Sequence, residues 1–310
     1  MAYRLQPGES VEEGMRRIAR EQIAKAEEEL GRADEDLHGV VHAFRKRCKK
    51  MRGLIRLVRP EFPGYAEENA WFRDRAAELS GVRDATSMQE CLAALIRRYG
   101  DDLADEAFAD VRDWLADRRA ALDDADVRQA LERVRSELPE AAARIDSWGL
   151  EAPGAAAIEA GLRKTYKRAR KSMHTAMEEP GAETFHTWRK RVKYHRYHTR
   201  LVSAAWPRVL KAVHREARRL SDVLGDDHDL AVLGAALRQE APEELRHAAL
   251  FALLDRRSAE LRAWSLALGN RLYVEDAASY AARLRAYLET WQREEEEGAL
   301  LVPQALRLYS

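Results

Sequence analysis

The sequence predicts an all-α protein, and three observations support this prediction. Strong helix formers, chiefly Ala, Leu, Arg and Glu, make up most of the 310 residues, whereas Gly (16) and Pro (9) are sparse. No stretch of strand length alternates apolar and polar residues. Apolar residues account for 46% of the chain, which is enough to build a core, so a wholly disordered chain is excluded.

Capping and stop signals predict where the helices of the first half begin and end. Ser10 and Glu13 form a capping box that opens a helix running to about residue 30, and Pro60 ends the next one. A second capping box at Thr86 and Gln89 opens another helix, and Pro139 is expected in a first helical turn. The further helices are expected at about 34–59, 64–80 and 86–100, with two or three more in 101–149.

The dipeptide Pro153-Gly154 interrupts the chain near its middle. We therefore divide the chain into an N-terminal helical half, 1–150, and a C-terminal helical half, 151–310, which together form one domain. In the second half the expected helices are 155–178, 182–205, 207–224, 227–239, 242–269 and 276–296. No run of about eighteen apolar residues occurs and the N-terminus lacks a hydrophobic signal core, so we expect a cytoplasmic protein without a membrane span.

The charges sum to zero but are sorted along the chain. Lys and Arg together number 53, as do Asp and Glu, and 34% of all residues are charged. Residues 42–59 contain eight basic residues, while 161–171 and 186–200 contain six each, and none of the three segments contains an acid. Residues 101–132 instead carry eleven acids against four basic residues. A neutral total therefore conceals basic and acidic blocks.

The chain contains an internal repeat that carries the basic blocks. His42-Ala-Phe-Arg-Lys-Arg-Cys-Lys aligns with His186-Thr-Trp-Arg-Lys-Arg-Val-Lys at an offset of 144 residues. Positions three and four apart share one face of a helix, and on that face the two segments have the same residue types. The first stripe is His42, Arg45, Lys49, Arg52 and Arg56, and the second stripe is His186, Arg189, Lys193, Arg196 and Arg200.

Each of these helices also has a separate apolar face for packing. In the first segment this face includes Phe44, Cys48 and Met51, and in the second it begins with Trp188 and Val192. Like charges three or four residues apart repel, so two unrelieved stripes of the same composition indicate an anionic partner. A simpler interpretation is that the stripes pair with acids elsewhere in the fold, but neutralisation alone does not require the same five residue types twice.

Each stripe covers fourteen residue steps, or about 21 Å at roughly 1.5 Å per residue, which suits an extended polyanion. Arginine can offer two parallel hydrogen bonds to phosphate oxygens, and lysine adds a compact charge. A weaker extension of the repeat, at an offset of 147, matches Arg16 and Arg20 with Arg163 and Lys167. We expect these four residues to flank the two stripes.

At these residues the sequence resembles the CHAD family, the conserved-histidine α-helical domains. The resemblance rests on the paired His-x-x-Arg-x-x-x-Lys-x-x-Arg segments, on Tyr197, and on Leu220-Ser-Asp-Val-Leu-Gly-Asp-Asp-His-Asp229, and it covers about residues 10–296. It implies two four-helix-type bundles related by a pseudo-twofold axis, with a central basic channel or groove. It also implies that the ligand is inorganic polyphosphate and that the protein is associated with polyphosphate granules. The Glu-x-Glu-x-Lys signature of the CYTH triphosphatase domain, which many relatives carry, is absent, so we expect a standalone member.

Two other classes of function stay open at this point. The cluster Asp226-Asp227-His228-Asp229 could belong to a metal-dependent phosphohydrolase of the His-Asp type, completed by some of His195, His198, His214, Asp255 and Asp276. These aspartates are, however, also expected as caps of a helix that begins after Gly225. A nucleic acid could occupy a basic groove, but aromatic residues are not interleaved on the stripes and the net charge is zero.

No nucleophile constellation and no glycine-rich phosphate loop occur, and Cys48 and Cys91 lack metal-ligand spacing. We therefore expect a non-enzymatic polyphosphate-binding protein with no cofactor and no bound metal. The acidic segment 101–132 is expected to keep the particle neutral and to limit binding to slender anions.

Overall fold

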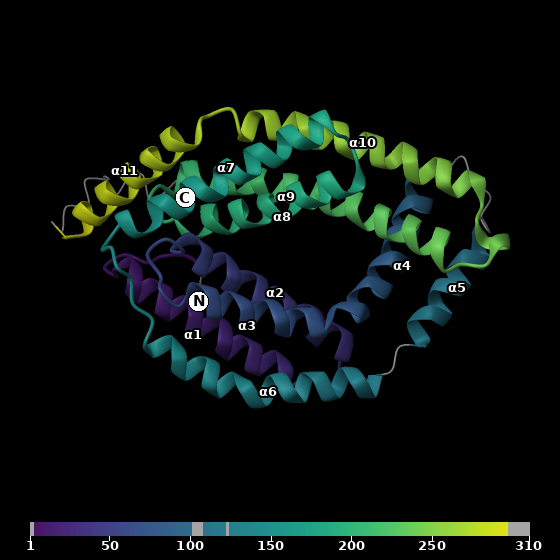
Figure 1. Cartoon of the computed structure of the whole chain (residues 1–310), viewed down its shortest axis with the longest axis horizontal. Helices are drawn as coiled ribbons and strands as arrows, with labels where there is room; N and C mark the ends of the chain where they lie inside the picture. The colour runs from purple at the N-terminus through teal and green to yellow at the C-terminus, as the bar shows by residue number, and fades with distance from the viewer. Residues whose placement is uncertain (1–2, 101–107, 122–123, 297–310) are drawn as a thin grey trace, which may run out of the picture.

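The structure is a computed structural model that describes residues 3–100, 108–121 and 124–296. In these ranges it contains eleven α-helices, one short 3-10 helix and no strand, which confirms the all-α prediction (Figure 1). The parts of the acidic segment at 101–107 and 122–123 lie outside the described residues.

The N-terminal half supplies six helices, several of which begin where the capping signals indicate. The Ser10 hydroxyl accepts from the backbone N–H of Glu13, and the Glu13 carboxylate accepts from the backbone N–H of Ser10, so the first capping box is confirmed. The six helices are α1 (Val11–Leu30), α2 (Leu37–Leu57), α3 (Tyr65–Glu78), α4 (Ser80–Tyr99), α5 (Ala109–Ala120) and α6 (Asp124–Asp146). Within this half, α2 packs against α1 and α3, α6 against α1, and α5 against α4.

The C-terminal half supplies five α-helices that are longer on average. They are α7 (Ala156–Glu178), α8 (Ala182–Leu201), α9 (Pro207–Gln239), α10 (Ala248–Leu272) and α11 (Ala277–Glu296), with the 3-10 helix η2 (Glu243–Leu245) before α10. Here α8 packs between α7 and α9, α10 against α9, and α11 against α7. Figure 1 shows these helices as one group, facing α1, α2, α3 and α6, while α4 and α5 lie toward the far end of α9.

Several expected helix boundaries are wrong, among them the start of the helix expected at 242–269, since α10 begins at Ala248. The helices expected at 207–224 and 227–239 are a single 33-residue helix, α9, because Gly225 has helical geometry and its neighbours Leu224 and Asp227 are buried on the packing side. The aspartates at 226–229 therefore do not cap a helix. Pro139 lies inside α6 rather than in a first turn. Helix α4 begins at Ser80 instead of at Thr86, because buried Ala85 continues the apolar face of Met88 and Leu92.

The apolar faces of the two repeated helices lie in the core, as predicted. Phe44, Cys48 and Met51 of α2 are each 1% exposed, and Trp188 and Val192 of α8 are fully buried. The stripes therefore lie on other faces of α2 and α8, which the burial of these side chains orients.

Helix α2 approaches α8 and α7 very closely, and glycines allow this. A Cβ atom on Gly53 would lie 2.9 Å from the ring of Tyr197, and the Nε2 of His198 donates a hydrogen bond of 3.0 Å to the Gly53 carbonyl oxygen. A Cβ atom on Gly161 of α7 would lie 1.7 Å from the carbonyl oxygen of Leu57. The two repeated helices are thus held together at the point where the two halves of the chain meet.

We predict that Gly161→Ala destabilises the protein because the added methyl group forces α7 away from the backbone of α2. The expected loss is about 1–3 kcal/mol in the free energy of unfolding, measured by urea denaturation. Gly100→Ala is the control, since Gly100 has helical backbone angles and a Cβ atom added there would meet nothing within 4 Å. That variant should be neutral or more stable by up to about 1 kcal/mol. Equal stability of the two variants would contradict the close approach.

Candidate anion-binding site

The first stripe lies on α2 and is backed by α3. His42 is exposed, and the four cations of this stripe are partly buried. Arg45 donates a hydrogen bond of 2.9 Å to the carbonyl oxygen of Ala76. Arg52 and Arg56 both donate to the side-chain oxygen of Asn69, at 3.2 and 3.0 Å. Asn69 is neutral, so it orients the guanidinium groups of Arg52 and Arg56 without cancelling their charge.

The second stripe lies on α8 and faces α9. The imidazole of His186 stacks on that of His228, with the ring centroids 4.0 Å apart and the planes 28° apart. Arg189 lies against Gly225 of α9, since a Cβ atom there would be in ordinary van der Waals contact with the Arg189 Nε atom, at 3.6 Å. Arg196 makes an ion pair of 3.3 Å with Asp222, an exposed residue of α9. Sequence reasoning placed His228 in a candidate metal site and did not anticipate this stack.

The two stripes meet where α2 crosses α8, at Lys49 and Lys193. Burial, then the charges of Arg189, Lys49 and Arg196, lower the pKa of Lys193 to about 6, and Asp229 opposes the shift only in part. The effect of Lys49 requires the two ammonium groups to lie within electrostatic reach of each other. Lysines at matching positions of the repeat are therefore neighbours in space.

The stacked histidines are neutral at pH 7. Burial, then Lys190 and Arg189, lower the pKa of His186 to about 4. Burial, then Arg189 and His186, lower the pKa of His228 to about 3. In this state the rings offer hydrogen bonds rather than charge, and the Nδ1 of His186 is buried without a hydrogen-bond partner among the described residues.

The four residues expected to flank the stripes lie in two different settings. Arg16 and Arg20 of α1 are ion-paired, Arg16 with Glu12 and Arg20 with Asp146 at the end of α6. Arg163 and Lys167 of α7 are exposed. The first pair is therefore partly neutralised within the N-terminal half, whereas the second pair projects from the surface.

A pocket that sequence reasoning missed lies between α2, α7 and α8. We call it the cationic pocket, and it is lined by Arg56, Arg59, Lys164, Thr165, Arg168, Arg191 and Tyr194. Only Arg56 belongs to a stripe. A signal for the others was present, because all five cations come from the three segments that contain no acid.

The aspartates at 226–229 point in different directions along α9. Asp227 is 1% exposed and accepts hydrogen bonds from Ser258 and from Arg262, the latter at 3.0 Å. Asp226 and Asp229 line another pocket together with Cys91 and Arg257. Burial and the charge of Asp229 raise the pKa of Asp226. The cluster is thus divided between a core ion pair, a mixed-charge pocket and the histidine stack.

Three of the other candidate ligands of a His-Asp site, His195, His214 and Asp276, have hydrogen-bond partners elsewhere, and Asp255 is exposed. His195 is buried and lies 3.1 and 3.0 Å from the hydroxyl groups of Tyr273 and Tyr280. His214 donates to the carbonyl oxygen of Arg196 at 3.1 Å, and Asp276 accepts from backbone N–H groups at the start of α11. Among the described residues, no three His, Cys, Asp or Glu side chains gather so as to hold a metal ion.

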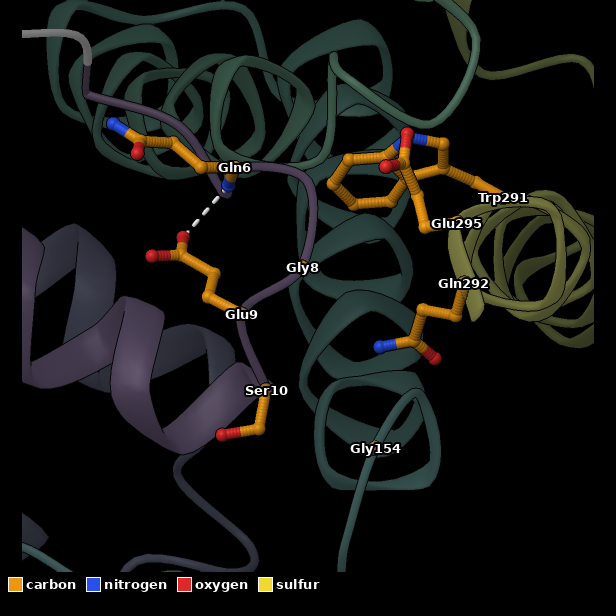
Figure 2. A pocket seen from close by; sticks show the side chains of 8 residues that line it. All are labelled: Gln6, Gly8, Glu9, Ser10, Gly154, Trp291, Gln292 and Glu295. Carbon is orange, nitrogen blue, oxygen red and sulfur yellow. Dashed lines mark hydrogen bonds between the residues drawn. The ribbon is translucent and has the colours of Figure 1, made fainter. Parts of the chain in front are cut away.

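A further pocket lies between the segment before α1 and the end of α11 (Figure 2). Its lining includes Glu9, Trp291 and Glu295, and the backbone N–H of Gln6 donates to Glu9 at 2.7 Å. No Lys or Arg is among its described lining residues, so its chemistry is opposite to that of the cationic pocket. In the described part of the chain, no helix is both long and apolar enough to cross a membrane.

These observations define a class of protein: it is all-helical, and two repeated helices bring their cations together. A family model of the CHAD domain matches residues 17–238, more than two thirds of the 310 residues, and the chain therefore belongs to the CHAD family. The match ends in α9, so it covers less of the chain than the resemblance suggested, and α10 and α11 lie beyond it. A search of the curated proteins finds no match.

We predict that the protein loses stability as the pH falls from 6.5 to 5. Burial lowers the pKa of His195 and of His198 to about 3, below the value near 6.5 of an unfolded chain. Each folded imidazole therefore stays neutral while the unfolded one gains a proton, which favours unfolding as the pH falls. Each histidine lowers the free energy of unfolding by up to about 1.4 kcal/mol per pH unit. Between pH 6.5 and pH 5, the two histidines together should therefore lower it by up to about 4 kcal/mol.

Urea denaturation at pH 7.5, 6.5 and 5 measures this change, in a range where exposed carboxylates stay mostly ionised. Substitution of the exposed His174 by Gln should leave the profile unchanged. A free energy of unfolding that stays constant between pH 6.5 and 5 would show that these histidines are not buried as described.

Proposed function

We propose that the protein binds inorganic polyphosphate through the two stripes and does not catalyse its turnover. The observation that carries this proposal is the packing of α2 against α8, which brings Lys49 and Lys193, equivalent residues of the two stripes, within electrostatic reach of each other. Like charges in such proximity destabilise the free protein, and a polyanion would relieve that repulsion. Membership of the CHAD family supports the same ligand class.

The pattern of the stripes favours a long chain over a single small anion. Each stripe covers about 21 Å along its helix, at roughly 1.5 Å per residue. Arg45, Arg52 and Arg56 are oriented by neutral acceptors on α3, so their guanidinium groups are held in place before a ligand arrives. Such preorganisation lowers the entropy lost on binding.

We further propose that the two halves, residues 1–150 and 151–310, are related by a pseudo-twofold axis near the α2–α8 crossing. Under the offset of 144, Lys49 is equivalent to Lys193 and Gly53 to Tyr197. Both equivalent pairs are neighbours in space. A twofold axis through this point would place the stripes around a central basic channel or groove. Association with polyphosphate granules would follow from binding of the polymer.

The alternative functions have less support. Trp188 is fully buried, and Tyr65 and Tyr194 are covered by the guanidinium group of Arg56, so these rings do not form a platform for bases. The phosphohydrolase hypothesis relied on the cluster at 226–229 as metal ligands, but Asp227 is buried inside α9 and paired with Arg262.

Reversing the charge of four stripe residues should abolish binding of long-chain polyphosphate, with a loss in affinity of more than a hundredfold. The variant replaces Arg45, Lys49, Arg189 and Lys193 with Glu, and filter binding measures affinity while circular dichroism checks helicity. The control reverses four exposed cations on other surfaces, Arg112, Arg133, Arg135 and Arg271. It has the same net charge and should bind within a few-fold of the original protein.

Binding should also weaken steeply as salt rises, as for other linear polyanions, and RNA should compete poorly for the site. Unchanged polyphosphate affinity in the stripe variant would rule out the proposed surface. Equal loss in the two variants would show that only net charge matters.

Polyphosphate affinity should rise as the pH falls from 8 to 6. Lys193 has a pKa of about 6 in the free protein, so it is mostly uncharged at pH 7. A bound anion favours its charged form and raises its pKa, so binding takes up a proton and is favoured by lower pH, by up to tenfold per pH unit. Titrations at constant ionic strength measure the slope.

Lys193→Arg is the matched variant because arginine stays protonated throughout this range. It should bind more tightly than the original protein at pH 8 and show a flatter dependence on pH. The same slope in both proteins would mean that Lys193 is not the group that takes up the proton.

A further inference from the structure

The cationic pocket is a small hollow that opens to solvent, and five positive side chains from α7, α8, the end of α2 and the turn after α2 line it. Arg56 comes from the last turn of α2 and Arg59 from the turn that follows it, while Lys164 and Arg168 come from α7 and Arg191 from α8. The remaining lining residues, Thr165 and Tyr194, carry hydroxyl groups, and no carboxylate lines the pocket among the described residues.

The mutual repulsion of these cations is visible in their acid–base behaviour. Burial, then Arg168 and Arg56, lower the pKa of the Arg191 guanidinium, and the phenols of Tyr194 and Tyr65 oppose the shift only in part. Burial, then Arg59 and Arg168, likewise lower the pKa of Lys164. Most arginines in a folded protein are stabilised by acceptors, so an arginine held among other cations indicates an absent anion.

Aromatic rings fix the orientation of two of the guanidinium groups. The Arg56 guanidinium lies 4.4 Å from the ring centroid of Tyr194, and that of Arg59 lies 4.5 Å from the ring centroid of Tyr65. The Nε of Arg56 is buried without a hydrogen-bond partner among the described residues. The pocket thus has donors that are positioned in advance and not fully used.

The internal repeat provides a comparison for Arg191. Its equivalent in the first half is Arg47, which donates to Glu29 at 3.1 Å and to Gln22 at 3.2 Å. At the offset of 147, Lys164 is equivalent to Arg17, which is ion-paired with Glu9 and with Glu21. Glu21 itself stands where the second half has Arg168. The same region of the repeat is therefore neutralised by acids in the first half and left cationic in the second.

Arg191 also lies apart from the second stripe. It is two residues from both Arg189 and Lys193, which is about 200° around the helix at roughly 100° per residue. The pocket is therefore on a different side of α8 from the stripe, and it contacts the first stripe only at Arg56.

We infer that the cationic pocket binds a single phosphate group bearing up to two negative charges, separately from the stripes. This group has two possible sources: free orthophosphate, or the terminal phosphate of a polyphosphate chain. Binding of a chain end rests on the proposed function. Five converging donors match the several oxygens of a tetrahedral phosphate, and the absence of lining carboxylates favours a doubly charged anion.

The direct test is orthophosphate binding by Arg191→Gln, measured by isothermal titration calorimetry at low salt. The substitution should weaken binding at least tenfold, because it removes charge-assisted hydrogen bonds. It should also raise the melting temperature of the ligand-free protein, because it relieves the repulsion from Arg168 and Arg56. Arg168→Gln should have the same two effects.

The matched control is Arg47→Gln at the equivalent repeat position. That variant loses the ion pair with Glu29, so its melting temperature should fall while its orthophosphate affinity stays unchanged. Unchanged phosphate affinity in both Arg191→Gln and Arg168→Gln, for orthophosphate and for linear tripolyphosphate, would overturn the inference.

Two short phosphates distinguish the sources of the group. Linear tripolyphosphate has terminal phosphates, whereas cyclic trimetaphosphate has none. If the pocket holds a chain end, Arg191→Gln should weaken binding of the linear compound and leave the cyclic one unaffected. If it holds only free phosphate, the effect should be confined to orthophosphate.

The stripe variant separates this inference from the proposed function. Long-chain binding that survives in the stripe variant, together with loss of orthophosphate binding in Arg191→Gln, would reject the proposed function and support the pocket. If the stripe variant loses long-chain binding and Arg191→Gln leaves phosphate binding unaffected, the proposed function is supported and the pocket is rejected as a phosphate site.

Discussion

The close crossing of α2 and α8 is the constraint on which the rest of the structure depends. Gly53 lets the ring of Tyr197 approach the backbone of α2, and His198 fixes the contact with a buried hydrogen bond. This crossing forces together two helices whose repeated segments, 42–59 and 186–200, contain no acid, so the core must hold them against their repulsion. Large buried side chains such as Phe44 and Trp188 supply the apolar burial that does so. Lys193 reduces the repulsion further, since its lowered pKa leaves it mostly uncharged at neutral pH.

Local signals were sufficient to predict most helices, because caps and the spacing of apolar residues act within a few turns. The capping box at Ser10 and the apolar face of Phe44, Cys48 and Met51 both have the predicted roles. The errors arose where tertiary packing overrides local preference. Gly225 suggested a break, but it is buried inside a continuous α9 and lies against Arg189 of α8, a contact that no local pattern contains.

The composition of the stripes could be read from the sequence, but their surroundings could not. The repeat identified which cations share a helix face, whereas the neighbours of each face depend on how the helices cross. The stack of His186 on His228 joins residues far apart in the chain, and the cationic pocket joins three acid-free segments that no local pattern brings together. Sequence symmetry also suggested equal roles for Arg16 and Arg163, but Arg16 is ion-paired with Glu12 and Arg163 is exposed.

The differences between the two halves explain how a chain of zero net charge can present a cationic surface. Acids in and just before α1 pair with cations inside the N-terminal half. Glu9 and Glu21 pair with Arg17, and Glu29 pairs with Arg47. The negative charge of these acids therefore offsets cations of the N-terminal half. The pocket between α2, α7 and α8 has no carboxylate among its described lining residues. An acid that is paired with a cation offsets the charge of that cation far better than a distant acid does, because Coulomb interactions weaken with distance and with solvent screening. The distribution of acids between repeats, and not their number, therefore decides where the molecule is positive.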